Sequence, residues 1–346
     1  MKVILLVGGR STEHDASLHS YAHVVDVILR HPDEMTLEAV VYVDRSGGFH
    51  VTRHTPWPVD MPTLSEPPLV PVGEALRQLA GTYCFSLLHG NEGEDGAWQG
   101  LAEIFGLQGS FGSVLASALS MNKRMQSLVV RQLIPEVAVP PTWALRPGTP
   151  LAEMVEELAG RPIVVKPNQM GASLLTRHLT EYSEEVLSAV VSDIFRFDTE
   201  ALIQEYIPGT EYSCGVIERD GKALALPVMR IRTEGGFFGH EQKHQHGGAR
   251  NSIASASGVV RAIQRHSERL FTELDLLGWA RFDYIASPAG IFFLEINSIP
   301  GLMSGSLFPR MLDAAGLGIV DLIRLTAQAA GRRAVRDKRL VYTIEH

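Results

Sequence analysis

The stretch of sequence that is most informative about the architecture is residues 279–301, WARFDYIASPAGIFFLEINSIPG. Two apolar runs, 279–286 and 290–297, have the length and composition of β-strands. Antiparallel pairing of these two strands would bring Asp283, Glu295 and Asn297 together. The pattern therefore predicts a pair of strands with a cluster of oxygen-bearing side chains on it.

Asp283, Glu295 and Asn297 offer three oxygen ligands, which suit Mg²⁺ held beside phosphate groups. The simpler alternative is that the two carboxylates are solvated at the surface. Strands as apolar as these are expected to be covered, however, and a buried carboxylate needs a cation or hydrogen-bond donors. We therefore predict a magnesium site here.

Two lysines have sequence surroundings that suit phosphate binding. Lys123 lies in a helix predicted at 113–133, and Lys166 ends the apolar strand 163–166. The glycine turn 169–173 follows Lys166, and its backbone N–H groups are able to cradle phosphate oxygens. A Walker loop is excluded, because no GxxxxGK[ST] pattern occurs. A lone lysine is usually solvated, so the neighbouring turn is what favours a nucleotide site.

The N-terminal part alternates strands with helices, as in a parallel α/β sheet. Strands are predicted at 2–7, 37–43 and 83–88, and an amphipathic helix at 16–29. The polar cluster HGNEGEDG, residues 89–96, follows the third strand. Open α/β sheets bind ligands at the carboxyl ends of their strands, so this cluster is a candidate site.

Within that cluster, His89 and Glu94 are the residues least easily explained by structure alone. Asp95 has a structural alternative, because an aspartate in this position can cap the helix that follows.

The chain is expected to divide into three domains, at 1–115, 116–207 and 208–346. The second domain is small, and we interpret it as a mobile lid. Residues 233–256, rich in Gly, His and Ser, are predicted to form a long loop in the third domain, which is either functional or disordered. The other elements predicted in these two domains are strands at 163–166 and 201–206, helices near 183–195 and at 258–277, and a hairpin at 219–221.

The composition is that of an ordinary globular protein. The 346 residues are 45% apolar, enough for a large core shared by two or three domains. A net charge of −8 without a long basic block argues against nucleic acid as a partner. The apolar N-terminal run is too short for a signal peptide or a membrane span. With Cys84 and Cys214 expected to be buried free thiols, we predict a cytoplasmic protein that does not enter a membrane.

Taken in order, these motifs resemble the D-alanine:D-alanine ligase family of the ATP-grasp superfamily, over about residues 2–330. The matching segments are HGNEGEDG with Gln99-Gly100, LASALSMNK at 115–123, Val165-Lys166-Pro167, Arg281-Phe282-Asp283 and EINSIPG at 295–301. The resemblance implies an α/β ATP-grasp fold with a parallel-sheet N-terminal domain, a central lid domain and a C-terminal catalytic domain.

The resemblance also implies an enzyme that uses ATP and two Mg²⁺ ions, with Mn²⁺ as a possible substitute, to join two small acids through an acyl phosphate. The residues implied to bind the nucleotide are Lys123, Lys166, Glu205, Glu211 and, in the long loop, Lys243. The implied metal ligands are Asp283, Glu295 and Asn297. The family's usual homodimer is expected here as well.

Substrate roles follow from the same resemblance. Glu13 would hold the ammonium of the first amino acid, with His89 and Ser173 in the substrate site. Arg281 and the backbone N–H of Gly301 would stabilise the tetrahedral oxyanion. The residues implied to meet the carboxylate of the second substrate are Ser306 and Leu307.

Two positions depart from the family's commonest pattern. Where that pattern has a serine and a tyrosine that connect to the N-terminal glutamate, this chain has Ala172 and His244. A cationic His244 beside Glu13 would repel an ammonium nucleophile and favour a hydroxy acid as second substrate. The alternative that His240, His244 and His246 bind a transition metal is less favoured, because their spacing on a glycine-rich loop is irregular.

Three functions remain open from the sequence. The first is a ligase for D-alanyl dipeptides of the cell wall, or a relative that uses D-serine or D-lactate. The second is a ligase of other amino-acid-like acids in secondary metabolism. The third is an ATP-binding protein without ligase activity. Ala172 and His244 favour this alternative, whereas the other motifs argue against it.

Overall fold

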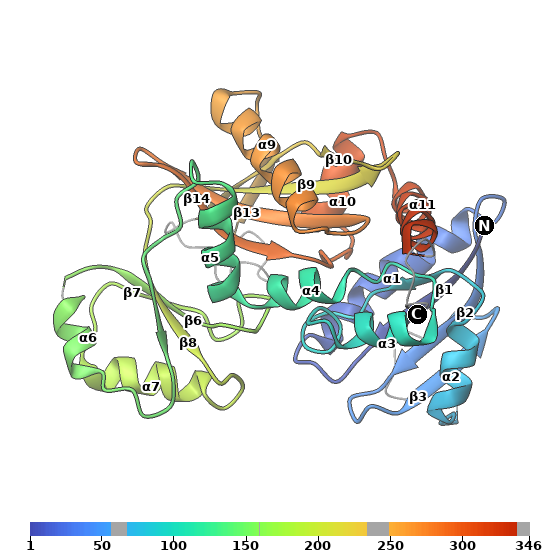
Figure 1. The fold of residues 1–346 in the computed structure, drawn as a ribbon, viewed down its shortest axis with the longest axis horizontal. Helices are drawn as coiled ribbons and strands as arrows, with labels where there is room; N and C mark the ends of the chain where they lie inside the picture. Colours follow the sequence, from blue (N-terminus) through green and yellow to red (C-terminus); the bar gives the residue numbers. More distant parts are fainter. Residues whose placement is uncertain (57–67, 159, 234–248, 338–346) are drawn as a thin grey trace, which may run out of the picture.

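The computed structural model describes residues 1–56, 68–158, 160–233 and 249–337. These residues form three β-sheets with helices packed around them (Figure 1). The N-terminal and C-terminal parts of the chain lie together, and the central sheet extends to the lower left of that view. Each sheet is formed by one continuous part of the chain.

The N-terminal sheet has the strand order β3-β2-β1-β4. Its strands are β1 (Lys2–Gly8), β2 (Thr36–Val43), β3 (Phe49–Arg53) and β4 (Cys84–Ser86). β1 pairs in parallel with β2 and β4, as predicted. β3, which lies at the edge and was not predicted, runs antiparallel to β2. The reason is a tight turn in which Asp44 Oδ1 accepts the backbone N–H groups of Ser46 and Gly48, at 2.7 and 2.9 Å.

The helix predicted at 113–133 is two helices. They are α4 (Val114–Met121) and α5 (Lys123–Leu133). Asn122 between them has an extended backbone, and its side chain accepts the N–H of Met125, which caps α5. The break places Lys123 at the first position of α5.

The other helices of the N-terminal part are α1 (His14–Arg30), α2 (Val72–Leu79) and α3 (Ala97–Phe105). The prediction at 16–29 corresponds to α1, whose buried face packs on β1 and β2. α2 was not predicted. The N-cap of α3 is Gly96 and not Asp95, although Asp95 Oδ1 accepts the backbone N–H of Ala97, the first residue of the helix, at 3.1 Å.

The central sheet has the order β5-β8-β6-β7 and its own hydrophobic core. Its elements are β5 (Thr142–Leu145), α6 (Ala152–Glu157), β6 (Ile163–Pro167), β7 (Arg177–Leu179), α7 (Glu184–Ile194) and β8 (Ala201–Glu205). The predicted strands and helix are confirmed, while β5, α6 and β7 were not predicted. α4 and α5 pack instead on β14 (Gly290–Asn297), a strand of the third sheet. The domain boundary at 116 stays a prediction.

The third sheet has the order β12-β11-β9-β13-β14, with β10 beside β9. Its strands are β9 (Thr210–Arg219), β10 (Lys222–Ala225), β11 (Met229–Thr233), β12 (Ala249–Ile253), β13 (Trp279–Ser287) and β14 (Gly290–Asn297). The hairpin and the last two strands are confirmed. The prediction of a loop at 233–256 is wrong near its end, because residues 249–253 form β12, which pairs antiparallel with β11. Its middle, 234–248, lies outside the described residues.

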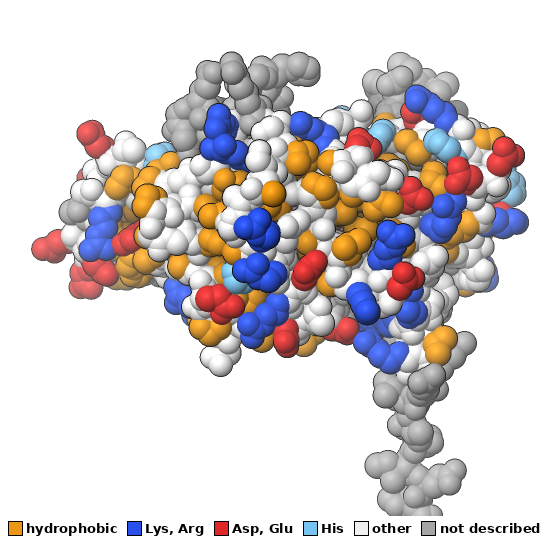
Figure 2. Space-filling model, turned by 90° about the horizontal axis from the view of Figure 1, so that it is seen from above, with side chains coloured by type: hydrophobic (Ala, Val, Ile, Leu, Met, Phe, Trp, Pro, Cys, Tyr) orange, Lys and Arg blue, Asp and Glu red, His pale blue; other side chains and the backbone are white. Residues whose placement is uncertain are grey.

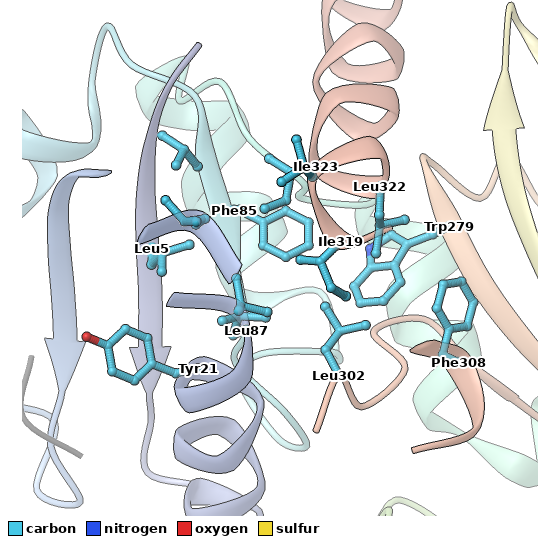
Figure 3. Close-up of a cluster of buried hydrophobic side chains, with 14 of the residues drawn as sticks. Leu5, Tyr21, Phe85, Leu87, Trp279, Leu302, Phe308, Ile319, Leu322 and Ile323 are labelled. Carbon is cyan, nitrogen blue, oxygen red and sulfur yellow. The ribbon is translucent and has the colours of Figure 1, made fainter. Parts of the chain in front are cut away.

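One buried cluster joins the N-terminal sheet to the C-terminal part (Figure 3). Phe85 of β4 stacks on Trp279 of β13 with 5.8 Å between ring centroids, and Leu302 lies in the same cluster. The remaining helices are α9 (Gly258–Glu273), α10 (Leu307–Ala314) and α11 (Ile319–Asp337). α10 and α11 contribute side chains such as Phe308 and Ile323 to the cluster. The two ends of the chain therefore share one core, and the central sheet has another.

Cys84 and Cys214 are buried free thiols, as predicted. Among the described residues, no helix is both long enough and apolar enough to span a bilayer. On the face seen in Figure 2, Lys and Arg side chains are interspersed with Asp and Glu, so this face presents no block of one charge.

Candidate active site

Two neighbouring cavities contain most of the predicted site residues. The first, of about 410 Å³, has Lys166 and Glu205 in its wall. The second, of about 600 Å³, has Glu13 and Gly301 in its wall, together with His89, Arg281, Asn297, Ser306 and Leu307. The residues that line both cavities are Lys123, Met170, Glu211, Asp283 and Glu295. The cavities therefore meet at two of the predicted metal ligands and one of the predicted phosphate-binding lysines.

The strand pair β13–β14 supplies the acidic residues at this junction. The antiparallel register places Asp283 opposite Glu295, and Arg281 opposite Asn297. Asn297 Nδ2 donates to Asp283 Oδ2 at 3.1 Å. The predicted convergence of the three oxygen-bearing side chains is confirmed.

Asp283 is almost fully occupied by protein donors. Arg281 donates to it through Nε and Nη2 at 3.0 and 2.9 Å, and Ser213 donates to Oδ1 at 2.5 Å. With Asn297 these donors fill the roughly four acceptor positions of a carboxylate. Burial acts to lower the pKa of Arg281, but the Asp283 carboxylate outweighs it and raises that pKa. In this structure Asp283 therefore orients Arg281 and keeps it charged.

The two lysines lie beside these groups. Lys123, at the start of α5, donates to the carbonyl of Met170, and its Nζ lies 3.8 Å from Glu295 Oε2. Lys166 is buried on β6, and its Nζ donates to Gln204 Oε1 at 3.0 Å. Both ammonium groups border the first cavity, where anionic phosphates would be stabilised.

The turn after β6 lies against the N-terminal part of the chain. A Cβ atom on Gly171 would lie 2.3 Å from Glu13 Oε1, so any larger residue here would displace the carboxylate of Glu13. Ala172, Ser173 and Leu175 have φ angles of 51°, 54° and 54°, a left-handed conformation that costs a non-glycine residue about 1–2 kcal/mol. A strained turn held next to the catalytic groups is typical of ligand-binding loops.

Glu94 connects the N-terminal domain to the loop after β14. Its Oε2 accepts the N–H of Gly90 at 2.8 Å, and its Oε1 accepts the N–H of Ile299 at 3.0 Å. Burial and the charge of Glu13 raise the pKa of Glu94 to about 8, against the hydrogen bonds that favour its charged form. Burial likewise lowers the pKa of the neighbouring His89 to about 4, so His89 is neutral at pH 7.

We expect Glu94→Gln to remove a pH dependence of stability. Between about pH 4.5 and about 8 the unfolded chain releases the Glu94 proton while the folded chain keeps it, so wild-type stability falls as the pH rises through this window. The thermal midpoint of the wild type, relative to that of Glu94→Gln, should therefore decrease from pH 4.5 to 8. Glu13→Gln removes the negative charge that disfavours ionisation of Glu94. This substitution should lower the pKa of Glu94 and so narrow the pH range over which stability falls. If the difference in thermal midpoint between the wild type and Glu94→Gln did not change with pH, the raised pKa of Glu94 would be contradicted.

The structure places the remaining predicted residues differently from one another. Ser173, predicted in the substrate site, lines the first cavity instead, and Glu205 is ion-paired with Arg161 at 2.6 Å. The predictions for Lys243, His244, His240 and His246 lie outside the described residues. Within the described ranges, no group of three His, Cys, Asp or Glu side chains could hold a metal ion, so the predicted magnesium set depends on Asn297. Sequence reasoning missed Ser213, which donates to Asp283, and Ser20, which lines the second cavity, because serines on apolar elements have no local signature.

Comparison with known proteins identifies relatives along almost the whole chain. Residues 2–110 match the family model described as D-ala D-ala ligase N-terminus, and residues 139–326 match the one described as D-ala D-ala ligase C-terminus. A D-alanine--D-alanine ligase from Mycolicibacterium gilvum is 30% identical, over 95% of this chain and 97% of the relative.

Solved structures share the fold. A D-alanine-D-alanine ligase from Coxiella burnetii has a TM-score of 0.78 at 22% identity, over 98% of this chain and 96% of its own. A D-Ala:D-Ser ligase from Enterococcus faecalis has a TM-score of 0.74 at 23% identity, over 95% and 99%. The chain thus belongs to the D-alanine–D-alanine ligase family, and it is an ATP-dependent ligase with the ATP-grasp fold.

Proposed function

We propose that the chain joins two molecules of D-alanine and converts ATP to ADP and phosphate. The observation that carries this proposal is the junction of the two cavities at Lys123, Asp283 and Glu295. A phosphoryl group passing from a nucleotide in the first cavity to a carboxylate in the second would cross this junction. Lysines and bound cations offset the repulsion between the two anions there.

The first cavity is the nucleotide site in this proposal. Lys123 and Lys166 hold the phosphates, and Glu211 and Glu205 hold the ribose and adenine, which requires Glu205 to exchange its Arg161 contact for the nucleotide. Lys243, outside the described residues, is proposed at the γ-phosphate. As ATP is an intracellular substrate, we also propose a cytoplasmic location.

The donor set at the junction fits Mg²⁺. This ion is commonly held by one or two carboxylates together with substrate phosphates. Glu295 and Asn297 supply a carboxylate and an amide oxygen, whereas Asp283 joins the set only by exchanging one of its protein donors. When bound, Mg²⁺ would neutralise charge on the phosphates.

The second cavity holds the two amino acids. Glu13 binds the ammonium of the first, and Ser306 and Leu307 meet the carboxylate of the second. The first carboxylate attacks the γ-phosphorus and ADP leaves, which gives an acyl phosphate. The amine of the second substrate then attacks the carbonyl carbon, the new C–N bond forms, phosphate departs and the amine loses a proton. After the amine attacks and before phosphate departs, the carbonyl oxygen carries a negative charge, which Arg281 and the N–H of Gly301 stabilise.

A different second substrate is the alternative, and Ala172 is the described residue that favours it. Its methyl group replaces a hydroxyl of the family's commonest pattern, and the fold is shared with a D-Ala:D-Ser ligase. With His244 these differences leave D-serine and D-lactate as candidate acceptors. The homodimer stays a prediction, to be measured by light scattering of the purified chain.

We expect ADP release from ATP and Mg²⁺ to require D-alanine, with D-alanyl-D-alanine as the product. The measurement is coupled ADP release with a panel of D- and L-amino acids and hydroxy acids, each product identified by mass spectrometry. Faster ligation of D-alanine to D-serine or D-lactate would assign the alternative acceptor. Nucleotide binding without ADP release from any member would instead support an ATP-binding protein without ligase activity.

A further inference from the structure

The loop that follows β14 is fixed at the residue next to Gly301. The N–H of Leu302 donates to Ser20 Oγ at 3.1 Å. The carbonyl of Leu302 lies 2.7 Å from Nδ1 of His23, and since a carbonyl only accepts, Nδ1 must carry the proton. Both polar backbone groups of Leu302 are therefore held by side chains of α1.

The rest of the loop is held by the same domain. Glu94 accepts the N–H of Ile299, two residues before Gly301, at 3.0 Å. The side chains of Ile299 and Leu302 are buried in the core shared by the two ends of the chain, where Figure 3 shows Leu302 among the labelled residues. The peptide that carries the Gly301 N–H is thus fixed on both sides.

Gly301 itself is open to the second cavity. Within the described part of the chain its N–H has no hydrogen-bond acceptor, and a Cβ built on it meets no atom within 4 Å. The surrounding contacts hold the backbone in place and leave this donor for a ligand.

A single helix connects this loop to Glu13. Glu13 is the N-cap of α1, and Ser20 and His23 lie three residues apart on one face of it. An α-helix rises 1.5 Å per residue, so about 15 Å of rigid helix separates Glu13 from His23. Motion of the N-terminal domain would carry Glu13 and the loop together.

We propose that His23 and Ser20 are positioning residues of the ligation reaction: through Leu302 they fix the Gly301 N–H relative to Glu13. Glu13 binds the ammonium of the first substrate and Gly301 faces its reacting carbonyl, so α1 sets the distance between the two ends of one amino acid. This inference rests on the proposed roles of Glu13 and Gly301. His23 does not line either cavity among the described residues, so it acts only through the loop.

The test compares His23→Ala with His23→Asn and His19→Ala. We expect His23→Ala to lower kcat with D-alanine by about 10- to 100-fold, because a displacement near 1 Å has effects of this size, and to leave KM for ATP within about twofold. The affinity for a phosphinate mimic of the tetrahedral intermediate should fall in the same ratio. His23→Asn keeps an N–H donor at the δ position and should recover most of the loss.

His19 is exposed on the same helix, so His19→Ala should behave as the wild type. Circular dichroism and thermal midpoints separate misfolding from mispositioning, and Ser20→Ala, which removes the other contact to Leu302, gives a second measurement of kcat against KM. Equal kcat for the His23→Ala and His19→Ala variants, or an effect on KM for ATP alone, would overturn the positioning role. A wild type that releases no ADP with D-alanine would contradict the proposed function, and with it the role inferred here.

Discussion

Glu295→Gln is expected to lower ATP-dependent turnover by about a thousandfold or more while the chain stays folded. The substitution preserves volume and removes one negative charge where the two cavities meet, next to Lys123. Position 295 then keeps an amide oxygen, but Asp283, which is occupied by protein donors, is the one carboxylate left in the proposed Mg²⁺ set. The measurement is ADP release at saturating ATP and D-alanine, with a thermal midpoint for each variant.

The matched control is Glu273→Gln, a change of the same kind at an exposed position on α9. It should retain wild-type turnover. Asp283→Asn is a poorer probe of the metal site, because it also leaves the partly buried Arg281 without its carboxylate partner. Breaking such a pair costs about 3–5 kcal/mol when one charge remains. Wild-type turnover in Glu295→Gln, at several Mg²⁺ concentrations, would contradict the metal assignment.

The strand pair at the junction could be predicted from the sequence because its information is local. Two apolar runs joined by a short turn favour an antiparallel hairpin. The register counted from the turn would set Asp283 opposite Leu294, however, and a register shift between Asp283 and Tyr284 brings Glu295 to that place. Lys166 and its glycine turn are predictable for the same reason. The fold followed largely from these short segments taken in order.

Contacts between distant segments could not be predicted. The hydrogen bond from Leu302 to Ser20 joins residues 282 positions apart, and neither has a distinctive local sequence. The position of Glu94 after a strand is visible in the sequence, but its hydrogen bond to the N–H of Ile299, 205 positions further on, is not. The apolar pattern of α4 and α5 continues through Asn122, so the break depends on side-chain capping rather than on periodicity.

Arg281→Ala is expected to lower kcat by about a hundredfold or more and to change KM for ATP little. Asp283 occupies Nε and Nη2 of Arg281, and among the described residues Nη1 has no partner, so this donor remains for the oxyanion in the second cavity. A contact made only with the transition state affects kcat, whereas the nucleotide lies in the other cavity. Steady-state kinetics with ATP varied at saturating D-alanine measures both constants.

Arg281→Ala also leaves Asp283 as a buried charge without its cation, so Arg281→Lys is the companion variant. Lysine keeps the positive charge but lacks the planar guanidinium group. The guanidinium lets one side chain donate two hydrogen bonds to Asp283 and still direct a third N–H at the substrate. Its kcat should therefore fall as well, although its thermal midpoint stays near that of the wild type. If Arg281→Lys retained full kcat, the fork would be unnecessary and charge alone would explain the residue. If both variants raised KM for ATP at unchanged kcat, Arg281 would belong to nucleotide binding and not to the oxyanion.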